Sequence, residues 1–368
     1  MRNLFVLMPS FENFGGHEFS FIKPLNLFSR NKNLNLIYLL PKLNKLKLKN
    51  KNYKIIFFSK EFKFIIKLIS ILANYLIIKK FFEKNLKNKD IIYLDGYSLY
   101  FLISFIFFYY TSNQKKIKLI LWLRYPITNS IKNNILKFFL YKICNLKETI
   151  FLTENELLEK NIKKNLENIK INKMPSLHNL SKFKKIKKIN KTNFTILCPG
   201  IYREEKYGKN LINFLESNLN NNFRLKISKK FKVKLKNTYY SLNKKIIFVD
   251  NNLNYKNFIK EVQKSDVIFL PYKMPAYKYR TSGLFFESIS LNKFTFVSNG
   301  TLMENDLKKF NLQSFAVKKW KDLKINRILN IIENKKNINN LRNFSDYYKK
   351  VNGPKSFSNK LNNLCEKF

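Results

Sequence analysis

The stretch Lys264–Gly300 reads KSDVIFLPYKMPAYKYRTSGLFFESISLNKFTFVSNG, and it decides the fold class of the chain. A short apolar run, Val267–Leu270, ends at a Pro-Tyr pair. A polar loop follows, and a second apolar run then begins at Ser282-Gly283. A third run, Phe294–Val297, closes the unit. Strand, loop, helix and strand in this order is the βαβ pattern of an α/β protein.

The start of the helix predicted after this loop has the features of an anion site. Thr281 or Ser282 can cap the helix, and Gly283 lets a ligand approach the backbone closely. The free N–H groups of the first turn and the helix dipole attract a phosphate. Glu287 lies one turn further on, on the same face as Gly283, where it can accept hydrogen bonds from sugar hydroxyls. The alternative is an ordinary capped helix with an exposed glutamate.

The composition of the chain is strongly basic. Its 368 residues leave room for two domains of ordinary size. The net charge of +47 indicates either a polyanionic partner or a bias toward residues with AT-rich codons. Residues 1–150 hold 26 basic and 7 acidic side chains, and the remaining 218 hold 45 and 17, so no separate basic tail stands out. This even spread favours compositional bias, although a basic surface would still attract anionic lipid headgroups.

Cysteine usage and hydropathy bear on the compartment. Cys144, Cys198 and Cys365 are far apart and odd in number, which fits a reducing cytoplasm and no metal-ligand cluster. The N-terminal apolar run is too short for a signal peptide. Phe62–Phe82 is interrupted by lysines, and Tyr97–Thr111 falls short of the ~20 residues that span a bilayer. We expect both to be helices of a soluble domain, the second deeply buried, and an interfacial role stays open for the first.

Apolar runs alternate with helical runs along the whole chain. The predicted strands of the first half are Asn3–Met8, Leu34–Leu40, Lys54–Phe58, Ile91–Leu94, Ile117–Leu123, Thr149–Leu152 and Ile169–Lys173. A basic linker at Met174–Lys191 separates them from a second alternation. Its strands are Phe194–Cys198, Phe223–Ile227 and Lys245–Val249, and its helices are Gly208–Asn218, Lys229–Tyr239, Tyr255–Lys264, Leu302–Lys309, Leu323–Ile332 and Ser356–Phe368. Such alternation predicts two parallel sheets, each covered on both faces.

Ligands of such sheets bind beyond the carboxyl ends of the strands, and several residues of the first domain fall there. Gly15 and Gly16 follow the first strand without forming a dinucleotide fingerprint, and they permit either a close ligand approach or a plain loop. His17 at the following helix start is either a site residue or structural. Asp95 and Arg124 also follow strands, and Asp95 is alternatively the N-cap of the next helix.

A second polar segment, Pro199–Gly208, follows the first strand of the second domain. Arg203 and Lys206 are three residues apart, so they can converge on one anion, and an arginine can bind phosphate through two hydrogen bonds. Gly200 relieves the turn. The alternative is a solvated charged loop. Seven of the eight glycines lie at predicted strand ends or in the adjoining loops, which indicates that the backbone there requires them.

Four motifs in this order resemble the GT-B glycosyltransferases, most closely the family-four-like group (glycosyl transferases group 1) that uses nucleotide-sugar donors. They are GGHE at 15–18, G-x-x-R-x-x-K at 200–206, LPY at 270–272 and SG-x-x-x-E at 282–287. The resemblance implies two Rossmann-like domains that face each other across a cleft. Residues 1–180 would form the acceptor-side domain and residues 193–345 the donor domain, and residues 346–368 would form a terminal helix that crosses back to the first domain.

The resemblance also implies roles for the polar residues. Arg203 and Lys206 would neutralise the donor diphosphate and stabilise the leaving group, the Ser282-Gly283 amides would hold the same diphosphate, and Glu287 would bind the ribose. The residues predicted as catalytic are Arg203, Lys206, His17 and Asp95, and those predicted to bind the donor are Gly15, Gly16, Gly200, Ser282, Gly283 and Glu287. No metal and no cofactor besides the nucleotide sugar is expected, because arginine and lysine supply the positive charge.

The chain departs from the family pattern at two positions. Tyr279 stands where many relatives carry a second acidic residue, and Arg124 stands where many carry a histidine. We expect a retaining glycosyltransferase that acts on a cell-surface glycan or lipid-linked acceptor, in the cytoplasm or peripherally on the inner face of the membrane. The alternatives are a non-catalytic relative, a basic nucleic-acid-binding protein, and a nucleotide-sugar epimerase with the same two-domain plan.

Overall fold

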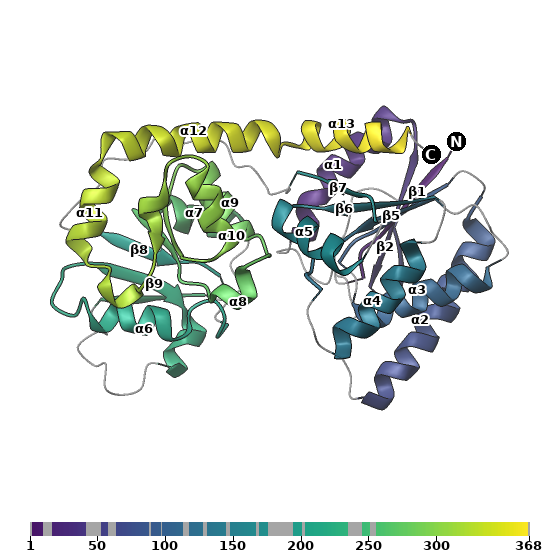
Figure 1. Ribbon diagram of the computed structural model, residues 1–368, viewed down its shortest axis with the longest axis horizontal. Helices are drawn as coiled ribbons and strands as arrows, with labels where there is room; N and C mark the ends of the chain where they lie inside the picture. The colour runs from purple at the N-terminus through teal and green to yellow at the C-terminus, as the bar shows by residue number, and fades with distance from the viewer. Residues whose placement is uncertain are drawn as a thin grey trace. The chain divides into compact units, whose positions relative to one another are not determined.

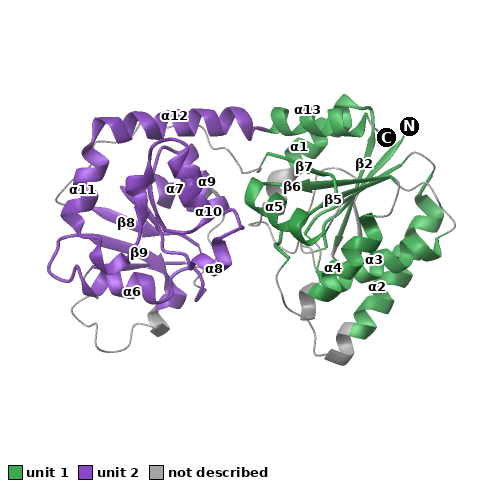
Figure 2. Ribbon diagram, viewed as in Figure 1, with its two compact units in different colours: residues 1–177, 354–368 green, residues 178–353 purple. Residues whose placement is uncertain are grey.

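A computed structural model divides the chain into two compact units (Figures 1 and 2). Unit 1 comprises residues 1–177 and 354–368, and unit 2 comprises residues 178–353. The structure describes residues 2–9, 17–41, 53–57, 64–87, 90–96, 98–112, 118–127, 131–144, 148–166, 169–175, 194–200, 203–234, 245–250 and 255–366. Most of the predicted linker, and Gly15 and Gly16, lie outside these residues.

Within its described residues, unit 1 holds a seven-stranded parallel sheet in the order β3-β2-β1-β4-β5-β6-β7. The strands are β1 (Asn3–Leu7), β2 (Asn35–Pro41), β3 (Tyr53–Phe57), β4 (Ile91–Leu94), β5 (Lys118–Trp122), β6 (Thr149–Thr153) and β7 (Ile171–Lys173). The helices are α1 (His17–Asn31), α2 (Phe64–Asn85), α3 (Leu99–Thr111), α4 (Ile131–Cys144), α5 (Glu156–Asn165) and α13 (Pro354–Cys365). Each strand agrees with a predicted run to within two residues.

Both faces of this sheet are apolar because helices cover both. Leu4 and Val6 of β1 belong to a core that includes residues of α1 and α13, whereas Phe5 packs on Phe82 of α2 with ring centroids 5.3 Å apart. This alternation explains why the strands read as continuous apolar runs. The prediction of a deeply buried helix over Tyr97–Thr111 is only half right, because α3 buries one face and exposes another.

Unit 2 holds, in the part the structure describes, a six-stranded parallel sheet in the order β10-β9-β8-β11-β12-β13. The strands are β8 (Thr195–Cys198), β9 (Arg224–Ser228), β10 (Ile246–Val249), β11 (Val267–Leu270), β12 (Phe294–Ser298) and β13 (Ala316–Val317). The helices are α6 (Gly208–Glu216), α7 (Tyr255–Lys264), α8 (Met274–Tyr277), α9 (Gly283–Ser290), α10 (Leu302–Lys308), α11 (Ile325–Glu333) and α12 (Lys335–Val351).

The secondary structure of unit 2 differs from the sequence prediction at three places. The helix predicted at Lys229–Tyr239 is a 3-10 helix over Lys229–Lys234 as far as the structure describes it, because apolar residues alternate with lysines there and make no helical stripe. The loop after β11 contains the one-turn helix α8. The long helix α12 had no predicted counterpart over most of its length, and it ends before Gly353-Pro354, where α13 begins.

The strand order of each sheet reverses at one place. In unit 1 the reversal lies between β1 and β4, and in unit 2 it lies between β8 and β11. Loops that leave two such strands in opposite directions open a crevice at their carboxyl ends, which is where open α/β sheets bind ligands. In unit 2 the loops concerned begin at Pro199 and Pro271, so the predicted anion segments fall at the switch point.

Candidate functional site

The two anion-binding segments predicted in unit 2 lie against each other. Gly200, two residues after β8, has a φ of +92°, and a Cβ built on it would come within 3.0 Å of Leu284 Cδ1 in α9. Glycine alone adopts this φ without strain and leaves room for the leucine. The loop after β8 is therefore seated on the first turn of α9, which excludes an arrangement with the two segments on opposite sides of the unit.

A buried tyrosine shapes this loop. The Tyr207 hydroxyl contacts the backbone carbonyls of Cys198 at 3.4 Å and Gly200 at 3.1 Å, and it donates a short hydrogen bond to that of Pro199. The N–H groups of Lys206 and Tyr207 both donate to the Arg203 carbonyl, at 2.9 and 3.2 Å. The segment is thus a built turn with internal hydrogen bonds and not merely a solvated charged loop.

Two cations flank a pair of aromatic rings beside the turn. Lys206 Nζ lies 5.7 Å from the centroid of the Tyr272 ring, and Arg280 Cζ lies 5.1 Å from that of Tyr277. The two rings are 4.3 Å apart. Aromatic faces attract cations without neutralising them. Lys206 and Arg280 therefore bring positive charge to the crevice from the loops after β8 and β11.

The electrostatics of Lys206 indicate an excess of positive charge. Burial, with smaller contributions from the nearby Arg203 and Arg280, lowers the pKa of its ammonium group to about 8, against the opposing effect of Glu205. Arg203 is about half exposed, with Nη1 3.9 Å from Glu205 Oε1, a distance typical of a weak surface pair. A bound anion would relieve this repulsion and raise the pKa of Lys206 again.

The helix start of α9 is capped as predicted, by Ser282 and not by Thr281. Ser282 Oγ accepts a hydrogen bond from the Phe285 N–H at 3.4 Å, and the serine is buried. The N–H groups of Gly283 and Leu284 have no carbonyl acceptor inside the helix, and they lie at the positive end of its dipole. This is the arrangement that phosphates bind in proteins.

Glu287 is not the exposed glutamate of the alternative interpretation. Burial raises the pKa of its carboxyl group to about 8, so the group is largely protonated at neutral pH. Across the described residues its carboxyl oxygens make no ion pair and no side-chain hydrogen bond. A partly buried carboxyl group with unused hydrogen-bonding capacity next to an anion site is suited to a polar ligand.

In unit 1, the candidates Asp95 and Arg124 form an internal ion pair. Arg124 Nε donates to Asp95 Oδ1 at 2.5 Å and Nη2 donates to Oδ2 at 2.6 Å, while Nη1 lies 3.4 Å from Glu154 Oε2. Asp95 is fully buried. Burial lowers the pKa of Arg124, but attraction and hydrogen bonds from Asp95, with a contribution from Glu154, outweigh it and raise that pKa above its ordinary value.

The capping interpretation of Asp95 is wrong. Ser98 is the N-cap of α3, and its hydroxyl accepts from the Phe101 N–H at 3.2 Å. Asp95 instead accepts from the Gly96 N–H at 2.7 Å and from Arg124. His17 begins α1, but its side chain, like Gly15 and Gly16, lies outside the described residues. Within the described part of the chain, no group of three or more His, Cys, Asp or Glu side chains could hold a metal ion.

Two residues after β11 were given no role from the sequence. Tyr277 and Arg280 lie in the segment predicted as a polar loop, and Tyr272 entered only as part of the LPY motif. The sequence did contain a signal for Arg280, which stands two residues before the capping serine. A cation at that place can bind the same anion as the N–H groups of the helix start.

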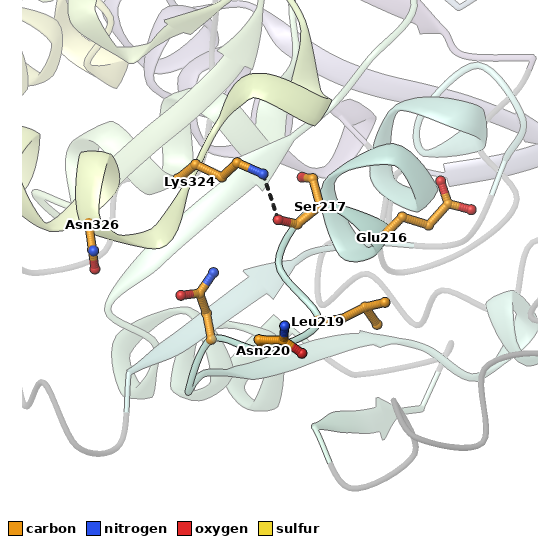
Figure 3. Close-up of a pocket in the computed structure, with 7 residues that line it drawn as sticks. Glu216, Ser217, Leu219, Asn220, Lys324 and Asn326 are labelled. Carbon is orange, nitrogen blue, oxygen red and sulfur yellow. Dashed lines mark hydrogen bonds between the residues drawn. The ribbon is translucent and has the colours of Figure 1, made fainter.

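A pocket elsewhere in unit 2 involves none of the predicted site residues (Figure 3). It is lined by Glu216, Ser217, Leu219, Asn220, Asn221, Lys324 and Asn326. Lys324 Nζ donates to the Ser217 carbonyl at 2.7 Å, just past the end of α6. Side-chain donors at this place satisfy carbonyl groups at a helix C-terminus, so the pocket has a structural explanation.

This chain is similar to known proteins in structure but not detectably in sequence. No protein-family model and no curated protein matches the sequence. Solved structures do match this chain in fold. The structure of HepE of Anabaena in complex with UDP-glucose aligns with this chain over 100% of each of the two chains. The sequence identity is 11% and the TM-score is 0.70. The chain has the GT-B fold.

Other solved structures agree with the GT-B fold. A trehalose-6-phosphate protein of E. coli bound with UDP-2-fluoro glucose covers 100% of this chain and 99% of its own at 12% identity, with a TM-score of 0.69. The spinosyn rhamnosyltransferase SpnG with thymidine diphosphate covers 98% and 100% at 10% identity, with a TM-score of 0.55. These structural similarities show the GT-B fold alone. The function of a protein with this fold depends on the residues of its site.

Proposed function

We propose that the chain is a glycosyltransferase that moves a sugar from a nucleotide-diphosphate-sugar donor to a cell-surface glycan or lipid-linked acceptor. The observation that carries the proposal is the seating of the Gly200 loop, with Arg203 and Lys206, on the first turn of α9. Proteins similar in fold were solved with UDP-glucose and with thymidine diphosphate, which supports the same ligand class.

The geometry of unit 2 supports the following mode of donor binding. The diphosphate would lie between the Gly200 loop and the N–H groups of Gly283 and Leu284. Arg203 and Lys206 would neutralise its charge, and Arg280 would add to that field. Glu287 would accept hydrogen bonds from the ribose hydroxyls, whose donation favours the ionised carboxylate. Close approach of the diphosphate to the backbone at Gly200 requires the absence of a side chain there.

The chemical step transfers one glycosyl group. The bond between the anomeric carbon and the diphosphate oxygen breaks, and its electron pair stays with the nucleotide diphosphate. The acceptor hydroxyl oxygen bonds to the anomeric carbon, and its proton passes to a phosphate oxygen or to water. Arg203 and Lys206 would stabilise the charge that develops on the departing oxygen, so the proposed step uses no metal. Retention at the anomeric carbon is proposed from the family-four-like resemblance.

Unit 1 would contribute the acceptor side. Gly15, Gly16 and His17 stay predictions there. For Asp95 the ion pair suggests a positioning role, because both of its oxygens already accept hydrogen bonds and a proton would have to displace Arg124. The proposed place of action is the cytoplasm, at the inner face of the membrane.

Binding and turnover with defined nucleotides test the proposal. The affinities for UDP, TDP and GDP are measured by calorimetry, and release of nucleotide diphosphate is followed with a panel of UDP-, TDP- and GDP-sugars. Arg203→Ala and Lys206→Ala should each weaken diphosphate binding by about 10- to 100-fold, because each removes a charged hydrogen bond. Turnover should fall by at least 100-fold.

Lys209→Ala is the matched control, because this lysine is exposed and lies in the first turn of α6 just beyond the loop. It should leave affinity and release unchanged. Binding without release from any donor would indicate a non-catalytic relative, and a changed sugar without transfer would indicate an epimerase. Failure of all three nucleotides to bind, with retention on RNA or DNA at physiological salt, would refute the proposal in favour of nucleic-acid binding.

A further inference from the structure

Three helices of unit 1 expose an unusual number of large apolar side chains. Of the fourteen large hydrophobic residues that are exposed in the described part of the chain, nine belong to α2, α3 and α4. Each of these nine is between 42% and 59% exposed. They are Leu68, Ile69, Leu72 and Leu76 of α2, Phe107 and Tyr110 of α3, and Ile135, Phe138 and Tyr141 of α4. We call this set the α2–α4 surface.

The set forms stripes and not scattered positions. Leu68, Leu72 and Leu76 are spaced by four, so they line one side of α2. Ile135, Phe138 and Tyr141 are spaced by three and line one side of α4. A helix of a globular protein ordinarily turns polar residues to the solvent. Here α2 is apolar on the side that packs against the sheet and again on the side that faces out.

The three helices lie side by side in unit 1 (Figure 1), and hydrogen bonds join them. Ser104 Oγ of α3 donates to the Ile71 carbonyl of α2 at 2.9 Å. The Tyr110 hydroxyl of α3 donates to the Lys142 carbonyl of α4 at 3.3 Å. The exposed stripes of neighbouring helices therefore belong to one surface. Contiguous exposed apolar areas of this kind mark interaction sites.

The charges around the surface are almost all positive. The sequences of α2, α3 and α4 contain seven lysines and one acidic residue, Glu83, whereas the whole chain has about three basic residues for each acidic one. Lys80 continues the leucine stripe of α2. Lys142 Nζ lies 5.4 Å from the Phe138 ring, and Lys79 Nζ lies 5.8 Å from the Tyr75 ring. Lysines thus stand at the edge of the apolar stripes.

We propose that the α2–α4 surface docks the protein onto an anionic lipid bilayer, with the apolar side chains in the interface and the lysines at the phosphate headgroups. Lysine-edged apolar helix faces bind at this depth of a membrane. A second copy of the chain fits the surface less well, because a two-fold interface sets like against like and would oppose the lysines of both copies. Among the described helices, none is long and apolar enough to cross a bilayer.

The biological role of this docking rests on the proposed function, because a protein bound at the membrane surface could reach a lipid-linked acceptor. Its test needs no sugar chemistry. Purified full-length protein is sedimented with vesicles of phosphatidylcholine alone and with vesicles containing 30% phosphatidylglycerol. We expect binding to the anionic vesicles that weakens with salt. Replacement of Leu68, Leu72 and Leu76 by glutamine should reduce the partition coefficient at least tenfold, and Lys79→Gln and Lys80→Gln should each reduce it by about fivefold.

A matched control removes three exposed apolar side chains of unit 2, with Leu219→Gln, Ile247→Gln and Tyr347→Gln, and should leave partition unchanged. A second readout does not depend on loss of binding. Leu72→Trp places an exposed indole on α2, while the chain's own Trp122 and Trp320 are buried, so its emission should shift to the blue on adding anionic vesicles.

Three results would overturn the proposal. They are no binding of the wild type to anionic vesicles, equal loss in the control variant, or an unshifted indole emission. A dimer in light scattering that the glutamine variant dissociates would instead assign the surface to a second copy. Nucleotide affinities measured without vesicles decide the proposed function separately, so failure of one does not entail failure of the other.

Discussion

Each unit gathers charged residues at the carboxyl edge of its own parallel sheet, yet the two clusters are balanced differently. In unit 1, Arg124 meets the carboxylates of Asp95 and Glu154, so the cluster is satisfied within the protein. In unit 2, Lys206 and Arg280 lie over aromatic rings. The same position in the fold can therefore stabilise the structure or bind a ligand. The two cases differ in whether the charged side chains are compensated by opposite charges within the protein.

The largest effect is expected where the charge is internally satisfied. Arg124→Met would leave Asp95 buried without its partner, and the free energy of unfolding of unit 1 should fall by about 3–5 kcal/mol. Urea titration followed by the fluorescence of Trp122 measures this in a Trp320→Phe background, because the chain has only these two tryptophans. Adding Asp95→Asn to Arg124→Met should recover most of the loss. A single variant as stable as the wild type would mean that the pair is not structural.

A smaller effect, of opposite sign, is expected at Glu287. Its carboxyl pKa is raised from 4.5 to about 8 in the folded protein, so the folded state holds an extra proton between these values and stability falls as pH rises from 4.5 to 8. Glu287→Gln removes this fall, and at pH 8.5 it should be more stable than the wild type by on the order of 2 kcal/mol. Thermal unfolding at pH 6, 7, 8 and 8.5 should show the gap in Tm widening. A gap in Tm that is constant with pH would contradict the raised pKa of Glu287.

The smallest effect is a pH dependence of affinity at Lys206. With a pKa near 8, its ammonium group loses its proton above that pH, and affinity for UDP should then fall by up to about tenfold per pH unit, or about 1.4 kcal/mol. Lys206→Arg keeps its charge in this range, so the ratio of wild-type to variant affinity removes the titration of the ligand itself. Calorimetry at pH 7.5, 8.5 and 9 measures that ratio. If it stays constant, Lys206 does not contact the diphosphate.

Local patterns in the sequence predicted much of the fold. The strands were found because parallel strands covered on both faces are continuous apolar runs, as at Val267–Leu270. The Ser282 cap and the turn at Gly200 were found because few residue types satisfy those backbone positions. These signals are contained within a few residues, so a single sequence reveals them.

The features that the sequence did not predict depend on contacts between distant residues. Asp95 and Arg124 are 29 residues apart, and nothing local shows that they pair or that Ser98, not Asp95, caps α3. The helix α12 was predicted only from residue 346 onward, although Ile338, Leu341 and Phe344 repeat at helical spacing before it. Its place is set by packing such as the stacking of Tyr348 on Phe286 at 4.4 Å. The Gly15-Gly16 segment stays a prediction of the sequence.

The last helix of the chain belongs to the first unit. Phe357, Leu361 and Leu364 of α13 sit in the same core as β1 and α1, and Phe357 stacks on Trp122 with ring centroids 5.9 Å apart. During synthesis the leading half of the chain therefore emerges with this side of its sheet covered by α1 but not yet by α13, and only the final dozen residues complete that core. A fragment cut after residue 177 would leave this part of the core exposed permanently.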